Sequence, residues 1–148
     1  MKYIHLLCLR EWLNSKKLVY SGERVRSYFW KALECELCKE SFENKMKSDL
    51  YKIMDFEFPS SEYLIMESVK SAPAKVVHVF YLDKGTEFRI GRSVETDMKI
   101  ADISVSRIHA FIKFNNGIIT LEDNGSKFGT LVKIRQPHQL CDYGSSLF

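Results

Sequence analysis

Three turns in the C-terminal half of the chain carry basic and hydroxyl side chains between apolar, β-prone segments. Arg92 occupies the first turn, Ser106 and Arg107 the second, and Lys127 the third. A phosphate dianion is bound by guanidinium groups, hydroxyl donors and free backbone N–H groups that converge on one point. Because turns can present such groups together, these four residues are candidates for a phosphate-binding site.

The segments that flank these turns have the residue pattern of β-strands. Asn116-Gly117 is a strong signal for a two-residue hairpin, and from position 76 onward turns follow at a spacing of roughly 8–12 residues. Short strands separated by regular turns favour a β-sandwich. The sequence predicts strands over residues 76–82, 87–90, 108–114, 118–121 and 131–134.

In the N-terminal part the apolar residues recur at a different spacing from that of the strands. Apolar residues recur at helical spacing over residues 6–13 and 25–33, so both segments are predicted to be helices. Residues 45–74 are mixed in character and contain two Ser- and Pro-rich stretches, which indicates a linker. Within this linker, residues 63–66 are either a short strand or a packing segment.

Two residue pairs in the N-terminal part have the spacing of zinc ligands. His5 and Cys8 are separated by two residues, as are Cys35 and Cys38. This spacing suits tetrahedral zinc, because a short turn directs both side chains at one metal ion. The alternative is that Cys8 and Cys35 are small buried apolar residues. This use of cysteine favours a reduced, intracellular protein, either cytoplasmic or nuclear.

Composition narrows the classes of partner. The chain has 148 residues, a net charge of +3 and 45% apolar residues. A charge this small does not argue for nucleic acid or a membrane surface as the partner. No apolar stretch approaches the roughly 18–20 residues that span a bilayer. No nucleophile–base pair or carboxylate pair supports a hydrolase or another small-molecule enzyme.

From about Lys75 onward the chain resembles the forkhead-associated (FHA) domain, a β-sandwich that reads phosphothreonine peptides. The resemblance implies that Arg92 clamps the phosphate or the peptide backbone and that the Ser106 hydroxyl donates to the phosphate. Arg107 can supply a second charge or contact the peptide chain, and Lys127 can add charge toward the phosphate. The resemblance also implies structural roles for three loop residues, with the ring N–H of the histidine holding its loop: Gly91, His109 and Gly129. The chain departs from the family at the third turn, where Phe128 occupies the position of an asparagine that bonds the peptide main chain.

The N-terminal residues resemble the second half of a RING-CH zinc finger, a module of some ubiquitin ligases. The last four ligands of that family would be His5, Cys8, Cys35 and Cys38, with zinc as the cofactor. In the family's cross-brace each of two zinc ions would then have two ligands here, and convergence of all four on one zinc would need a rearranged fold. The resemblance further implies that a ubiquitin-conjugating enzyme docks on three residues: Leu9, Trp12 and Leu13.

These observations predict an α+β chain: a small helical zinc-finger remnant followed by an all-β sandwich of FHA type. The expected parts are a partial zinc finger over residues 1–44, a linker over 45–74 and an FHA domain over 75–148, with both modules shortened. The predicted function is recognition of a phosphothreonine-containing protein. Ubiquitin-protein transferase activity is expected only if a longer parent supplies the missing Cys ligands. The alternative is a pure binding adaptor with a vestigial zinc segment.

Overall fold

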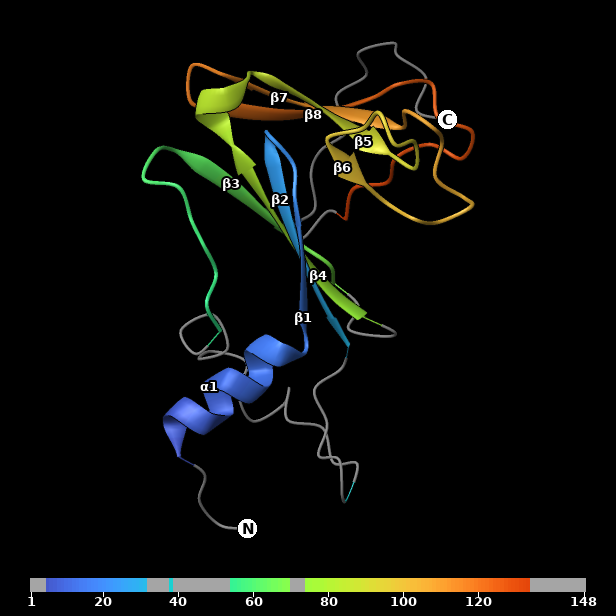
Figure 1. The fold of residues 1–148 in the computed structure, drawn as a ribbon. Helices are drawn as coiled ribbons and strands as arrows, with labels where there is room; N and C mark the ends of the chain where they lie inside the picture. Colours follow the sequence, from blue (N-terminus) through green and yellow to red (C-terminus); the bar gives the residue numbers. More distant parts are fainter. Residues whose placement is uncertain (1–4, 32–37, 39–53, 70–73, 134–148) are drawn as a thin grey trace.

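The computed structural model describes residues 5–31, 38, 54–69 and 74–133. In this part of the chain the strands form two four-stranded sheets, with one α-helix at the N-terminal end (Figure 1). No helix among these residues combines the length and the apolar character that a membrane crossing requires. In chain order the elements are α1 (Leu6–Ser15), β1 (Lys17–Ser21), β2 (Val25–Lys31), β3 (Tyr63–Glu67), β4 (Ala74–Tyr81), a 3-10 turn η1 (Leu82–Lys84), β5 (Glu87–Gly91), β6 (Met98–Lys99), β7 (Ala110–Asn115) and β8 (Ile118–Asp123).

The first sheet is antiparallel throughout and has the strand order β1-β2-β4-β3. The central strand β4 pairs with β2 from Ala74 to Phe80 and with β3 from Val77 to Tyr81. The predicted strand over residues 76–82 is therefore confirmed as far as Tyr81, and Leu82 begins the 3-10 turn η1. Of the two interpretations for residues 63–66, the structure selects the strand, as β3.

The predicted helix over residues 25–33 is wrong, because Val25–Lys31 form strand β2. Ser27 and Tyr28 are adjacent, so they point to opposite faces of the sheet, yet both are buried. A strand that is covered on both faces loses the simple alternation of apolar and polar residues. Its apolar positions then match a helical period by coincidence. Residues 32 and 33 lie outside the described residues.

The first sheet draws its strands from all three predicted parts of the chain. β2 lies in the predicted zinc finger and β3 in the predicted linker, and both are hydrogen-bonded to β4 in the predicted FHA part. The described residues are mostly β-sheet with one helix, and they do not show a separate helical zinc finger. The domain boundaries at residues 44 and 74 stay predictions.

The second sheet has the strand order β6-β5-β7-β8. β7 and β8 form a hairpin in which Asn116 has φ 51° and Gly117 has φ 77°, which is the left-handed backbone that a two-residue hairpin turn needs. The hairpin predicted at Asn116-Gly117 is thus confirmed. The strand predicted over residues 131–134 is not formed by residues 131–133, and Ile134 lies outside the described residues.

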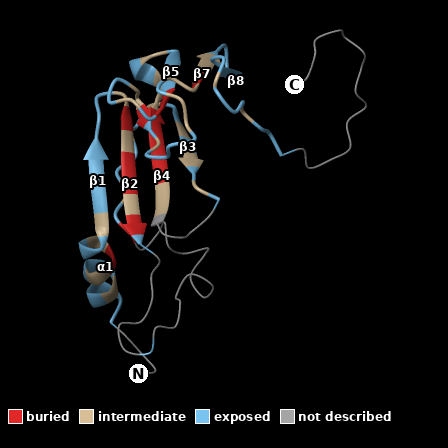
Figure 2. Ribbon diagram, turned by 90° about the vertical axis from the view of Figure 1, so that its right-hand side faces the viewer, coloured by how far each residue is buried: buried red, intermediate tan, exposed pale blue. Residues whose placement is uncertain are grey.

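The two sheets pack together through one apolar cluster near the upper end of the first sheet (Figure 2). Val25 and Phe80 of the first sheet meet Phe88, Ile90 and Ile112 of the second. The rings of Phe80 and Phe88 meet edge to face with centroids 5.3 Å apart. This cluster anchors β5 and β7, so it also sets the position of the loops that follow β5 and precede β7.

A second apolar cluster covers the other face of the first sheet. Leu13 of α1 is fully buried there against Tyr28, Trp30 and Val79, and Leu9 and Trp12 are partly buried beside it. The three residues predicted to dock a ubiquitin-conjugating enzyme therefore contribute to the core of this protein. Leu13 presents no side-chain surface to a partner.

Ser27 and His78 form a buried polar pair inside the first sheet. The burial of His78 makes the stability of the fold depend on pH. His78 is 5% exposed, its Nδ1 lies 2.7 Å from the Ser27 hydroxyl, and burial lowers its pKa from 6.5 to about 4. Above pH 6.5 the imidazole is neutral in both states, whereas between pH 6.5 and 4 only the unfolded chain binds the proton. Stability should therefore fall across this window by about 3 kcal/mol at most. Urea unfolding at a series of pH values should show a shallower fall for His78→Gln, and equal slopes would contradict this.

Candidate functional site

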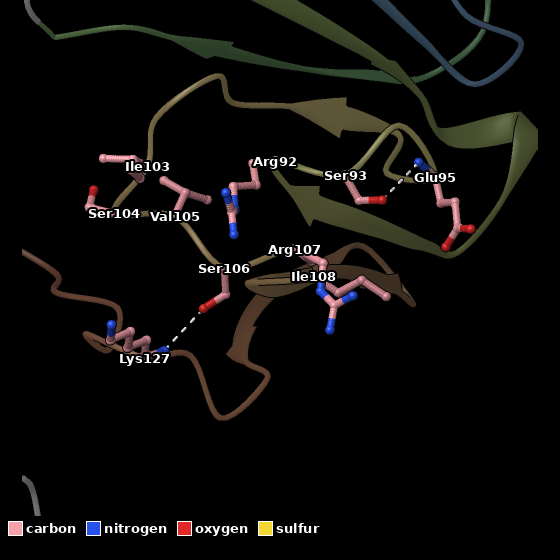
Figure 3. Close-up of a pocket in the computed structure, with 10 residues that line it drawn as sticks. All are labelled: Arg92, Ser93, Glu95, Ile103, Ser104, Val105, Ser106, Arg107, Ile108 and Lys127. Carbon is pink, nitrogen blue, oxygen red and sulfur yellow. Dashed lines mark hydrogen bonds between the residues drawn. The ribbon is translucent and has the colours of Figure 1, made fainter.

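Three loops at one end of the strands of the second sheet bring the predicted phosphate ligands into one pocket (Figure 3). Three residues lie opposite one another across β5, β7 and β8: Ile90, Ala110 and Asp123. The loops that adjoin them therefore meet at the same end of these strands. The pocket has a volume of about 800 Å³. It is lined by Arg92, Ser93, Glu95, Ile103, Ser104, Val105, Ser106, Arg107, Ile108 and Lys127. All four residues predicted to bind the phosphopeptide are among them.

Close packing at Gly91 joins the first two loops. A Cβ atom on Gly91 would lie 2.9 Å from the Ser106 carbonyl oxygen and closer still to that of Arg107. The backbone N–H of Arg92 donates to the Ser106 carbonyl (3.1 Å). The backbone N–H of Ser93 donates to the Arg107 carbonyl (3.1 Å). The absence of a side chain at Gly91 thus allows the two loops to bond directly.

His109 holds the second loop through both its backbone and its ring. Its backbone N–H donates to the Ile90 carbonyl (2.8 Å), and its Nδ1 accepts a hydrogen bond from the Ser106 backbone N–H (3.2 Å). The family resemblance implies that a ring N–H holds the loop, whereas here the ring nitrogen is the acceptor. Nδ1 is therefore unprotonated, and Nε2 lies 3.9 Å from Asp123 Oδ1.

The third loop is organised by Asp123, a residue that the sequence analysis did not select. Its carboxylate accepts hydrogen bonds from the Ser126 hydroxyl (2.6 Å), the Ser126 backbone N–H (2.9 Å) and the Thr130 hydroxyl (2.6 Å). These bonds lower the pKa of Asp123 to about 2, with the Ser126 hydroxyl as the largest cause. The loop closes around Gly129, whose φ of 74° is left-handed.

The carboxylate of Asp123 thereby places Lys127 beside Ser106. The Lys127 backbone N–H donates to the Ser106 hydroxyl oxygen at 3.0 Å, drawn as a dashed line in Figure 3. That hydroxyl oxygen already accepts one hydrogen bond, so its own hydrogen is free to donate to a ligand in the pocket. The predicted role of Ser106 as a hydroxyl donor to phosphate stays a prediction, and this geometry leaves its hydrogen available for that role.

The pocket carries more positive than negative charge. Arg92, Arg107 and Lys127 are exposed, and none of them has a carboxylate partner among the described residues. Among the described residues that line the pocket, Glu95 contributes the one carboxylate. An anion that enters the pocket would therefore meet unpaired cations and would not have to break an existing ion pair.

Phe128 stands at the edge of this site in an exposed position. Its side chain is 65% exposed, and the Lys127 ammonium lies 5.3 Å from its ring centroid. The phenyl ring cannot supply the amide contacts of the asparagine that it replaces. It instead holds the Lys127 head group close to the loop.

The sequence carries a turn signal for several site residues that were not predicted. Ser126 follows Asp123 at the spacing of a side-chain-capped turn, and Ser104 follows Asp102 in a similar way, with its N–H and hydroxyl both bonded to the carboxylate. Both patterns mark loops that are held in one shape. Glu95 and Ile103 carry no comparable signal, because only the folded loops place them in the pocket.

The predicted zinc ligands are only partly visible in the structure. Cys8 Sγ and His5 Nδ1 lie 3.9 Å apart, and Cys38 is a free, exposed cysteine. Cys35 lies outside the described residues. A structural zinc ion takes four ligands, and no group of three or more His, Cys, Asp or Glu residues within the described part could hold a metal ion. Because Cys35 is not among those residues, zinc stays a prediction from the sequence.

Comparison with known proteins supports the C-terminal resemblance alone. The matched range excludes residues 1–87, so the RING-CH resemblance of the N-terminal segment and the ubiquitin-conjugating enzyme it implied as a partner are unsupported. No curated protein and no solved structure matches the chain. The family model of the FHA domain matches residues 88–142, a range that includes every predicted phosphopeptide ligand, and the chain therefore contains an FHA domain.

Proposed function

We propose that this protein binds a phosphothreonine-containing protein through the pocket formed by Arg92, Ser106, Arg107 and Lys127. FHA domains are phosphothreonine-peptide readers, and the matched range covers all four residues. The observation that carries the proposal is the convergence of three unpaired cations and a free hydroxyl donor in one pocket.

The chemistry of these residues accounts for selection of phosphate over a carboxylate. A phosphothreonine carries about −1.5 to −2 charges at neutral pH, whereas Asp or Glu carries one. The Arg92 guanidinium can donate two parallel hydrogen bonds to phosphate oxygens, and the Ser106 hydroxyl can donate one more. Arg107 and Lys127 add charge from either side. A carboxylate has two oxygens and would leave part of this donor set unused.

The direct test is a titration of the chain with fluorescent peptides. A degenerate phosphothreonine peptide pool should bind, and the same pool with unmodified threonine should not. Binding should weaken below about pH 6, where the phosphate becomes a monoanion. Equal affinity for both pools would overturn the proposed function.

Two neighbouring serines provide a matched test of the hydroxyl donor. Ser106→Ala removes a donor to a charged ligand and should weaken phosphopeptide binding by about 10-fold. Ser104→Ala should leave the affinity nearly unchanged, because the Ser104 hydroxyl already donates to Asp102 at 2.7 Å. Fluorescence anisotropy would measure both variants. Equal losses for the two would mean that the Ser106 hydroxyl does not contact the phosphate.

A further inference from the structure

Glu95 is held at a defined place in the first loop of the pocket. Its backbone N–H donates to the Ser93 hydroxyl (3.3 Å), and the Thr96 hydroxyl donates to the Ser93 carbonyl (2.7 Å) and to that of Gly91 (3.2 Å). These bonds form a compact turn directly after Arg92. The backbone that carries Glu95 is therefore positioned relative to the phosphate ligands.

The two acidic residues of this turn have different environments. Asp97 accepts a hydrogen bond from the Arg89 backbone N–H (2.8 Å) and forms an ion pair with Arg24 (3.1 Å), so its charge is used within the fold. Glu95 is exposed, lines the pocket and has no cationic partner among the described residues. Its carboxylate is free to meet a ligand.

The positive and negative charges of the pocket therefore lie on opposite sides of it. Figure 3 shows Lys127 on one side of Arg92 and Ser106, and Glu95 on the opposite side. A phosphate bound between Arg92 and Ser106 would leave the Glu95 carboxylate beside the continuing peptide chain. A basic side chain in the peptide would find an opposite charge there, whereas an acidic one would be repelled.

We infer that Glu95 selects a lysine or arginine side chain that flanks the phosphothreonine of the bound peptide. This inference rests on the proposed function. Because the carboxylate is exposed, the contact acts as a rim ion pair, which contributes about 2- to 5-fold in affinity and weakens as salt is raised. Its main effect is on the choice among phosphothreonine peptides.

The experiment measures the affinity for a set of phosphothreonine peptides that are otherwise neutral. Each peptide has a single lysine at a different position on one side or the other of the phosphothreonine. The unaltered chain should bind the lysine peptide about 2- to 5-fold more tightly at one or two positions. Glu95→Gln should remove that preference, so that the lysine peptide and the lysine-free peptide bind with equal affinity, even where the lost negative charge strengthens the binding of both. Glu95→Lys should reverse it, so that glutamate at the same position is preferred over lysine.

A matched control separates this local contact from a general effect of net charge. Glu62→Gln makes the same change of charge at an exposed residue outside the pocket and should retain the lysine preference. A flat lysine scan, or an equal preference in the unaltered chain and in Glu95→Gln, would overturn the inference alone, provided that the phosphothreonine peptides bind. Failure of every phosphothreonine peptide to bind would overturn the proposed function together with it.

Discussion

Replacing Arg92 with alanine is expected to weaken phosphothreonine-peptide binding by at least about 100-fold while the fold stays intact. Two charge-assisted hydrogen bonds to phosphate oxygens would be lost, at about 1.5 kcal/mol or more each. The Arg92 side chain is exposed and has no partner among the described residues, whereas its backbone N–H bond to Ser106 does not depend on the side chain. Isothermal titration and a urea unfolding curve would measure the two effects separately.

Two further variants identify which property of Arg92 accounts for the loss of affinity. Arg92→Lys keeps the charge but loses the planar fork, so it should recover only part of the affinity. Arg89→Ala removes an exposed arginine from β5 that does not line the pocket, so it should bind as the unaltered chain does. An Arg92→Ala protein that binds with unchanged affinity would show that the phosphate is held elsewhere.

The four predicted phosphopeptide ligands could be placed near one another from the sequence because each lies within a few residues of a turn, and the structure places all four in one pocket. Gly91 and Gly129 mark the first and the third of those turns, and Asn116-Gly117 marks the hairpin that joins the two strands between the second and the third. The arrangement around Asp123 was missed because an aspartate near a glycine is common in loops of every kind. Its role depends on three hydrogen bonds that form only when the loop has folded back on the strand end.

The N-terminal part was harder to predict because its pairing is not local. Ser27 and His78 are hydrogen-bonded although they are 51 positions apart. Such a contact leaves no periodic signal in either segment. The apolar face of α1 shows the same limit: Leu9, Trp12 and Leu13 would have this spacing whether they dock a partner or pack on a sheet. The structure shows that they pack on the sheet.

A methyl group at Gly91 is expected to disable the site without changing any ligand. In Gly91→Ala the new Cβ would stand 2.9 Å from the Ser106 carbonyl oxygen and closer to that of Arg107, and both neighbours are backbone atoms that cannot rotate away. The second loop must then move off β5, which separates Ser106 from Arg92. We expect a loss of about 1–3 kcal/mol in stability, as in other overpacked sites, and a loss of phosphopeptide affinity of at least about 10-fold.

The matched control is Gly117→Ala in the hairpin between β7 and β8. That glycine has a φ of 77° with no atom within 4 Å of an added Cβ, so alanine there costs about 1 kcal/mol of backbone energy and meets no neighbour. Both variants should unfold at lower urea concentrations, but only Gly91→Ala should lose binding at concentrations where the protein is folded. If both variants kept full affinity, the two loops would be able to separate without moving the ligands, and the contact at Gly91 would serve stability alone.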